Sequence, residues 1–239
     1  MITATGVIVP SAGRGSRMGT GQAKQLQPIN GTAILAHTVC RLLALDSVRY
    51  LIVPTSTDLY QVTRNILSQC LKETEKSDTV KIEVIAGGAE RMDSVRNGLV
   101  NLMNTDAELV LVHDAVRPCF PLEAVEKAVD VAMSRGAACL GVPASDTIKL
   151  VDEDHRVIST PVRKRVWHAQ TPQIFHKHIL FEAYKKAEES GFSATDDASL
   201  VEYAGYPVHM VEGNRQNIKI TYPSDLFFAE KWIQENTRT

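Results

Sequence analysis

The stretch T-G-V-I-V-P-S-A-G-R-G-S-R-M-G-T-G-Q-A-K-Q, residues 5–25, joins a short apolar run to a glycine-rich basic loop. The run Thr5–Pro10, rich in β-branched residues, predicts a buried first strand. Glycines directly after a strand let the backbone turn tightly and present amide groups to a phosphate, while Arg17 and Lys24 add positive charge. The stretch therefore favours phosphate binding over a plain solvated turn.

This loop matches neither of the two common nucleotide-binding motifs. No Gly-Lys-Ser/Thr follows it, as a Walker A loop requires. A dinucleotide fingerprint that began at Gly13 and Gly15 would need a third glycine where Met18 stands. A nicotinamide-dependent oxidoreductase on a doubly wound sheet is thus an alternative that the loop disfavours.

Outward from the loop, short apolar runs alternate with segments of helical periodicity. We expect strands at residues 50–54, 81–86, 109–113 and 138–143, and helices at residues 34–43, 59–71, 93–103 and 122–134. Because parallel strands need crossover helices, the alternation predicts an α/β fold in three layers, with a mostly parallel sheet covered on both faces. Ligands of such sheets bind beyond the carboxyl ends of the strands.

The alternation loosens between residues 145 and 171. Short strands at 147–150 and 156–159 predict a projecting hairpin, which has few large apolar residues for a core element and so favours an arm that packs on another subunit. Beyond it we expect helices at 179–190 and 196–203, strands at 208–212 and 218–221, and a helix from Ser224. With no linker-like tract, we expect one domain over residues 1–239, with the arm at about 145–171.

The composition is that of a globular protein whose charge is nearly balanced. Lys and Arg number 26 against 28 Asp and Glu, and 44% of the residues are hydrophobic, which argues against disorder and against a polybasic nucleic-acid binder. No apolar run approaches the ~18 residues of a membrane span, and the N-terminus has no signal-peptide pattern. Four scattered cysteines fit reduced thiols, so we expect a cytoplasmic protein with no membrane partner.

The acidic residues are distributed unevenly along the chain. None precedes Asp46, whereas Arg14, Arg17, Lys24 and Arg41 all do. Such a stretch could contact nucleic acid, but it contains no aromatic residue for base stacking, and the whole chain carries a charge of −2. A local site for a polyanion is the favoured interpretation.

Further polar segments fall at or near predicted strand ends. The first is G-G-A-E-R-M-D-S-V, residues 87–95, where a glycine pair lets a flat ring approach the backbone and Ser94 offers a hydrogen bond. The second is V-H-D-A-V-R-P, residues 112–118, where Asp114 can accept from ribose hydroxyls or ligate Mg²⁺. A spread-out set of cations and hydroxyls suits a second anionic substrate, and it comprises residues 163–165, 167–173, 195–197 and 217–219.

These segments together resemble the 2-C-methyl-D-erythritol 4-phosphate cytidylyltransferases of the non-mevalonate isoprenoid pathway. The shared motifs, in order, are A-G-x-G-x-R-M with Lys-Gln beyond it, E-R-x-D-S-V, V-H-D-A-V-R-P, W-H-A-Q-T-P-Q, T-D-D-A-S and V-E-G-x-x-x-N-I-K-I-T. The resemblance runs from about Val7 to Ile233. Two departures, Ala23 before the loop lysine and Ser11 where Ala or Gly is usual, remove no charged group.

The resemblance implies a Rossmann-like nucleotidyltransferase sheet, a homodimer joined by the hairpin arm, and transfer of CMP from CTP to the phosphate of methylerythritol phosphate, with Mg²⁺ as cofactor. By resemblance, the catalytic residues are Arg17, Lys24 and Lys219. The nucleotide would contact Ser11, Ala12, Gly13, Gly15, Gly88, Ala89, Ser94, Asp114 and Ala115. The acceptor would contact Thr171, Thr195, Lys219 and Arg163, the last reaching across from the partner's arm. Mg²⁺ would be held mainly by CTP, with Asp114 as the candidate protein ligand.

A cytidylyltransferase of the same fold that uses ribitol 5-phosphate is the nearest alternative. The segments W-H-A-Q-T-P-Q and T-D-D-A-S favour methylerythritol phosphate, whereas V-H-D-A-V-R-P is shared too widely to discriminate.

Overall fold

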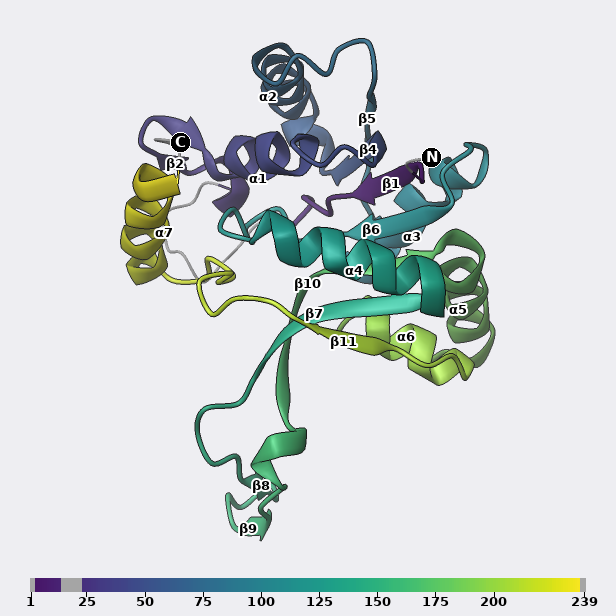
Figure 1. Cartoon of the computed structure of the whole chain (residues 1–239), viewed down its shortest axis with the longest axis vertical. Helices are drawn as coiled ribbons and strands as arrows, with labels where there is room; N and C mark the ends of the chain where they lie inside the picture. The colour runs from purple at the N-terminus through teal and green to yellow at the C-terminus, as the bar shows by residue number, and fades with distance from the viewer. Residues whose placement is uncertain (1–2, 14–22, 237–239) are drawn as a thin grey trace.

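A seven-stranded sheet forms the centre of the protein, with its strands in the order β11-β7-β10-β6-β1-β4-β5 (Figure 1). The computed structural model describes residues 3–13 and 23–236. The strands are β1 (Thr5–Ile8), β4 (Val48–Thr55), β5 (Lys81–Ala86), β6 (Leu109–Val112), β7 (Ala137–Pro143), β10 (Trp167–His176) and β11 (His209–Glu212). All neighbours are parallel except β10, which runs antiparallel to both β6 and β7. The mostly parallel sheet is thus confirmed.

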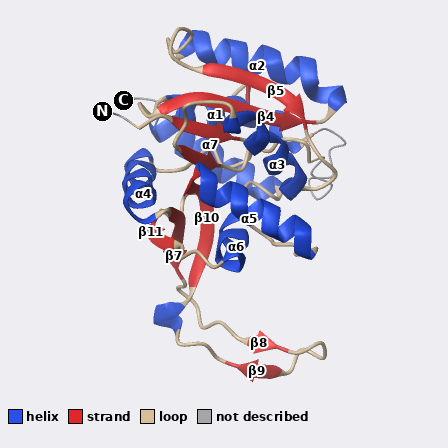
Figure 2. Cartoon of the chain, turned by 90° about the vertical axis from the view of Figure 1, so that its right-hand side faces the viewer, coloured by secondary structure: helices blue, strands red, loops and turns tan. Residues whose placement is uncertain are grey.

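Helices cover both faces of the sheet and complete the predicted three layers. On one face lie α1 (Ile34–Leu43), α2 (Tyr60–Glu73) and α4 (Leu122–Arg135), and on the other lie α3 (Arg91–Met103), α5 (Lys177–Ser190) and α6 (Asp197–Ala204) (Figure 2). Successive strand residues point to opposite faces: Val7 packs in the first core and Ile8 in the second. Among the described residues, no helix is long and apolar enough to span a membrane.

Strand β10 was not predicted, because several of its buried positions are polar. Gln170, Thr171 and Gln173 are each 6% exposed or less. The side chain of Gln173 donates to Oδ2 of Asp196 at 2.7 Å and accepts from the backbone N of Ala198 at 2.9 Å. A pattern based on hydrophobicity cannot identify a strand whose buried side chains are satisfied by such hydrogen bonds.

The prediction of a strand at residues 218–221 is wrong. This segment makes isolated contacts in place of a ladder: the backbone N of Ile220 donates to the carbonyl of Val116 at 3.0 Å, and the buried side chain of Asn217 donates to the carbonyl of Thr171 at 2.8 Å. The following helix α7 (Pro223–Asn236) packs beside the small hairpin of β2 (Pro28–Ile29) and β3 (Thr32–Ala33). Their shared core includes Ile29 and Trp232.

The predicted hairpin arm is present between β7 and β10. Strands β8 (Leu150–Val151) and β9 (Val157–Ser159) pair antiparallel at its tip, which projects away from the sheet in both views (Figures 1 and 2). Its apolar side chains are exposed, for example Ile158 at 67% and Val162 at 64%. The role of this arm in a dimer stays a prediction.

Candidate active site

One hollow of about 220 Å³ lies where the ends of β1 and β6 meet the turn that follows β5. It brings together most of the residues that the sequence predicted for the nucleotide and for catalysis. Those that line it are Ser11, Ala12, Gly13, Lys24, Gly88, Ala89, Ser94, Asp114, Ala115 and Lys219. The predicted residues Gly15 and Arg17 lie outside the described residues.

In the turn before α3, the backbone packs so closely against neighbouring residues that glycine is required at two positions. A Cβ atom on Gly88 would lie 2.1 Å from Cβ of Asp93, and one on Gly87 would lie 2.5 Å from Cβ of Ala12. The hydroxyl of Ser94 accepts from the backbone N of Gly88 at 3.0 Å and donates to the carbonyl of Glu90 at 3.2 Å. Two glycines and one serine thus fix a narrow turn against the first loop, where a flat ring can approach the backbone.

Ser11 holds the first loop in place. Its backbone N donates to the carbonyl of Pro54 at 2.8 Å, and its carbonyl accepts from the Gln25 side chain at 2.6 Å. Lys24 and Gln25 both belong to a short 3₁₀ helix, Lys24–Leu26. The anchor at Gln25 therefore positions Lys24 at the hollow, a role of Gln25 that sequence reasoning missed.

Three cations converge on the carboxylate of Asp114. Arg91 Nε lies 3.2 Å from Oδ1, while Arg117 Nε and Lys219 Nζ lie 3.2 and 3.1 Å from Oδ2. Burial would raise the pKa of Asp114, but the three cations hold that pKa well below its usual range. The carboxylate is therefore ionised, and its surroundings carry excess positive charge that suits a polyanion. Arg91 and Arg117 stood in quoted motifs, but their convergence on Asp114 was not predicted.

His113 and Thr171 hold the backbone of Asp114. The ring atom Nε2 of His113 lies 2.9 Å from the carbonyl of Arg117, which can only accept, so Nε2 carries a proton. Burial lowers the pKa of His113 to about 4, which keeps the ring neutral and leaves Nδ1 as an acceptor. The Thr171 hydroxyl then donates to Nδ1 at 3.0 Å and accepts from the backbone N of Asp114 at 3.1 Å. This buried threonine lines neither the first hollow nor the second one, next to it.

A second hollow adjoins the first at Lys219. Its lining includes Arg117, Ser145, Arg215 and Lys219. Arg117 also donates to the carbonyl of Asn217 at 2.8 Å, which fixes the segment that carries Lys219. One lysine therefore borders both hollows, as a residue would that must face two substrates. The sequence assigned no role to Ser145 or Arg215, and Arg215 stands at an unspecified position of the V-E-G-x-x-x-N-I-K-I-T motif.

Besides Thr171, two more predicted acceptor residues line neither hollow. Arg163 lies at the base of the arm, where its Nη1 atom donates to the carbonyl of Ser145 at 3.1 Å. Thr195 is exposed and precedes α6. Within one chain, Arg163 does not line the second hollow, but it donates a hydrogen bond to Ser145, which does.

Asp114 does not fit the predicted role of a magnesium ligand. Both of its oxygens already face cations, which would repel a divalent ion brought between them. Within residues 3–13 and 23–236, no group of three His, Cys, Asp or Glu side chains could hold a metal. A metal at this site would need its ligands from a bound phosphate chain.

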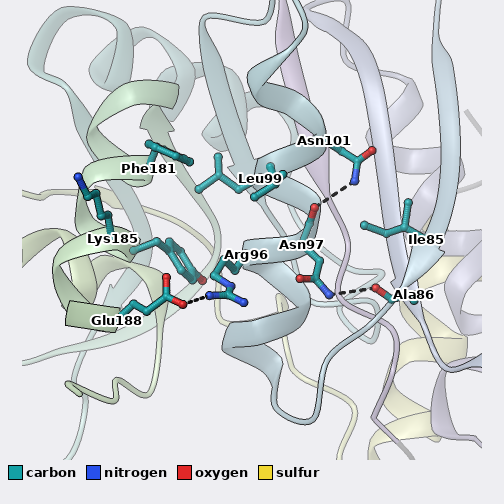
Figure 3. A pocket seen from close by; sticks show the side chains of 11 residues that line it. Ile85, Ala86, Arg96, Asn97, Leu99, Asn101, Phe181, Lys185 and Glu188 are labelled. Atoms are coloured by element: carbon teal, nitrogen blue, oxygen red, sulfur yellow. Dashed lines mark hydrogen bonds and ion pairs between the residues drawn. The ribbon is translucent and has the colours of Figure 1, made fainter. Parts of the chain in front are cut away.

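A larger hollow of about 500 Å³ lies between α3 and α5 (Figure 3). The side chain of Asn97 donates to the carbonyl of Ala86 at 3.2 Å, and Arg96 pairs with Glu188. These polar groups are already partnered, and none of the residues predicted for the site lines this hollow. We therefore place the candidate site at the two smaller hollows.

Comparison with known proteins gives a consistent result. A model of the family described as 2-C-methyl-D-erythritol 4-phosphate cytidylyltransferase matches residues 5–235. The protein of that name from Syntrophus aciditrophicus is 44% identical over 230 residues, which are 95% of each chain. The one from Alkaliphilus metalliredigens is 41% identical over 94% of this chain and 90% of its own.

Solved structures of such enzymes share the fold. The 4-diphosphocytidyl-2C-methyl-D-erythritol synthase of Anaerococcus prevotii superimposes with a TM-score of 0.83 at 30% identity, covering 98% of this chain and all of its own. The 2-C-methyl-D-erythritol 4-phosphate cytidylyltransferase of Thermus thermophilus gives 0.74 at 29% identity, covering 97% of this chain and 100% of its own.

Proposed function

The chain belongs to the 2-C-methyl-D-erythritol 4-phosphate cytidylyltransferase family, and we propose that it transfers CMP from CTP to the phosphate of methylerythritol phosphate, releasing pyrophosphate. The observation that carries this proposal is the position of Lys219, which borders both hollows beside Asp114. One hollow would take the nucleotide and the other the acceptor. The reacting phosphates would then meet at a lysine.

The transfer needs positioning and charge more than covalent help from the protein. An oxygen of the acceptor phosphate attacks the α-phosphorus of CTP, and the bond to the β-phosphate breaks with its electron pair leaving on pyrophosphate. Lys24 and Lys219 would stabilise the negative charge that gathers on the phosphorus. Arg17 and Gly15, predicted in the same loop as Lys24, would bind the triphosphate.

Cytosine would lie against the turn at Gly88 and Ala89, with Ser94 fixing that turn from behind. The main chain at Ala12 and Gly13 would form the opposite wall. Ribose hydroxyls would donate to Asp114, whose low pKa keeps it an acceptor. Recognition of the base would therefore depend chiefly on backbone groups.

The cation cluster would change partners when substrate phosphates arrive. Without them, Asp114 neutralises part of the charge of Lys219 and Arg117. Phosphate oxygens carry more charge than one carboxylate and would compete for both cations. The acceptor would thus be held by Arg117 and Lys219, with Ser145 lining the same hollow.

Mg²⁺ would enter with CTP, held by oxygens of the triphosphate and not by Asp114. Bound there, the ion would draw the triphosphate into a compact shape and offset its charge. Mg²⁺ thus remains the proposed cofactor, but Asp114 is no longer its proposed ligand.

A homodimer would bring Arg163 of one arm to the acceptor hollow of the other subunit. The exposed apolar side chains of the arm, such as Ile158 and Val162, support a surface that another subunit covers. Thr195 would contact the acceptor from the edge of α6. The cytoplasm, as predicted, would supply CTP.

The test is pyrophosphate release from CTP and Mg²⁺ with methylerythritol phosphate or ribitol 5-phosphate offered separately. We expect release with methylerythritol phosphate and little with ribitol 5-phosphate. Faster release with ribitol 5-phosphate would favour the alternative acceptor. Release with neither, together with tight NAD binding, would revive the oxidoreductase.

A further inference from the structure

A chain of polar side chains leads from Asp114 into the helical layer. Arg91 bridges two carboxylates, with Nε 3.2 Å from Oδ1 of Asp114 and Nη1 2.9 Å from Oδ2 of Asp197. The hydroxyl of Tyr184 donates to Oδ1 of Asp197 at 2.6 Å. The chain thus runs from the end of β6 through α3 and α6 to α5.

The inner half of this chain is closed to solvent. Asp197 is 0% exposed and Tyr184 is 3% exposed. Burial would lower the pKa of Arg91, but Asp197 and Asp114 raise it above its usual value, so the guanidinium stays charged. A buried ion pair adds little net stability compared with well-packed apolar residues. Its presence beside the site therefore points to a role in geometry.

The pair joins two segments that the two substrates would use. Arg91 is the first residue of α3, directly after the turn that contains Gly88. Asp197 is the first residue of α6, two positions after Thr195. The contact between Arg91 and Asp197 therefore fixes the nucleotide-binding turn relative to the edge of the acceptor site.

We propose that Arg91 and Asp197 are positioning residues for cytidylyl transfer, a role that rests on the function proposed above. When substrate phosphates engage Lys219 and Arg117, Arg91 is the cation that continues to hold the Asp114 carboxylate. Asp197 in turn holds Arg91. Without this support both substrates still bind, but they align poorly for attack.

The variant that tests this role is Asp197→Asn, which keeps the side chain's shape and its acceptor for Tyr184 but removes the charge facing Arg91. We expect kcat to fall at least roughly tenfold, because small misplacements of reacting groups are costly. The dissociation constant of CTP, measured by calorimetry without acceptor, should change little. The double variant Arg91→Gln/Asp197→Asn should lose no more than the more affected single variant, since the two residues act as a unit.

Arg96→Gln is the matched control. Arg96 lies on the same helix α3 and pairs with Glu188 of α5, as Figure 3 shows, but it faces the larger hollow. Its side chain is 42% exposed, and it lines neither of the two smaller hollows. We expect its kcat and both KM values to match those of the unaltered protein.

An unchanged kcat in folded Asp197→Asn would overturn the proposal. So would a loss of kcat fully explained by a smaller CTP-binding fraction, which is the result of a purely structural role. If Asp197→Asn does not fold, Arg91→Lys serves instead. Lysine keeps the charge but lacks the planar guanidinium whose Nε and Nη1 atoms contact the two carboxylates. An unaltered protein that releases no pyrophosphate would contradict the proposed function and not this inference alone.

Discussion

The ammonium group of Lys219 lies 3.1 Å from Oδ2 of Asp114, at the border between the two smaller hollows. The contact joins the end of β6 to a segment more than one hundred residues later in the chain. The Thr171 hydroxyl accepts from the backbone N of Asp114 and donates to His113, which fixes the position of Asp114. Asp114 in turn fixes the position of the lysine. In the proposed reaction, the two substrates meet at Lys219.

Replacing Lys219 by Met should therefore lower kcat by roughly 10²–10³, the range for losing one preorganised electrostatic group. The charge lost is one that would stabilise the pentacoordinate phosphorus. Steady-state pyrophosphate release at saturating CTP measures the effect. Lys185→Met is the control, since Lys185 is exposed and pairs with Glu189 at 3.8 Å. Near-normal turnover of Lys219→Met would remove Lys219 from the chemistry.

Gly88→Ala should lower the stability of the fold by about 1–3 kcal/mol, as overpacking does. The new Cβ would lie 2.1 Å from Cβ of Asp93, so the turn must shift. The same shift should raise KM for CTP. Urea unfolding measures the stability change. Gly13→Ala serves as its control because a Cβ there meets no atom of residues 3–13 and 23–236 within 4 Å. Equal unfolding midpoints for the two variants would contradict the tight packing of this turn.

The neutral state of His113 should make stability fall in mild acid. Burial lowers its pKa from 6.5 to about 4, so the unfolded chain takes up a proton first as the pH falls. The free energy of unfolding should therefore decline between about pH 6.5 and pH 4, by on the order of 3 kcal/mol, and stay level above this window. Urea titrations across the window measure the slope. His113→Gln should flatten it, and an equally steep slope in that variant would assign the acid effect elsewhere.

Mixing two impaired variants, assayed at a low acceptor concentration, tests whether the site is shared between subunits. Lys24→Ala should lower kcat by roughly 10²–10³ through lost charge stabilisation, and Arg163→Ala should chiefly raise KM for the acceptor. A mixed dimer contains one site with both residues intact if Arg163 acts across the interface. Recovery of activity on mixing after subunit exchange is the expected result. No recovery in demonstrably mixed dimers would place Arg163 in the site of its own chain or outside both.

The sequence was sufficient to predict the layered fold, because apolar periodicity follows directly from burial. It failed where buried positions are polar, as at Gln173 in β10. It also failed at the alternating I-K-I stretch around Lys219, which suggested a strand but joins no sheet in the part of the chain that the structure describes. The loop and turn residues of the nucleotide hollow were predicted by motif. The support of Asp114 by Thr171 was not, because a hydroxyl with two buried partners has no signature in a sequence.

The convergence of charges on Asp114 was also beyond the sequence. Arg91 and Arg117 are both in quoted motifs. Arg117 is only three residues after Asp114, but Arg91 follows β5 and reaches the same carboxylate only through the tertiary structure. The three cations also disfavour Asp114 as a metal ligand for as long as they stay paired with it. The distances between such charged groups depend on the tertiary structure and can be obtained only from it.

The most direct test of the account follows the oxygen atoms during the reaction. The protein is incubated with CTP, Mg²⁺ and methylerythritol phosphate whose non-ester phosphate oxygens carry ¹⁸O. The masses of the products are then determined by mass spectrometry. Direct attack of the acceptor phosphate on the α-phosphorus predicts that all of the label appears in the cytidine diphosphate ester and none in pyrophosphate. Label in pyrophosphate, loss of label to water, or the absence of a cytidine diphosphate ester would contradict the proposed transfer.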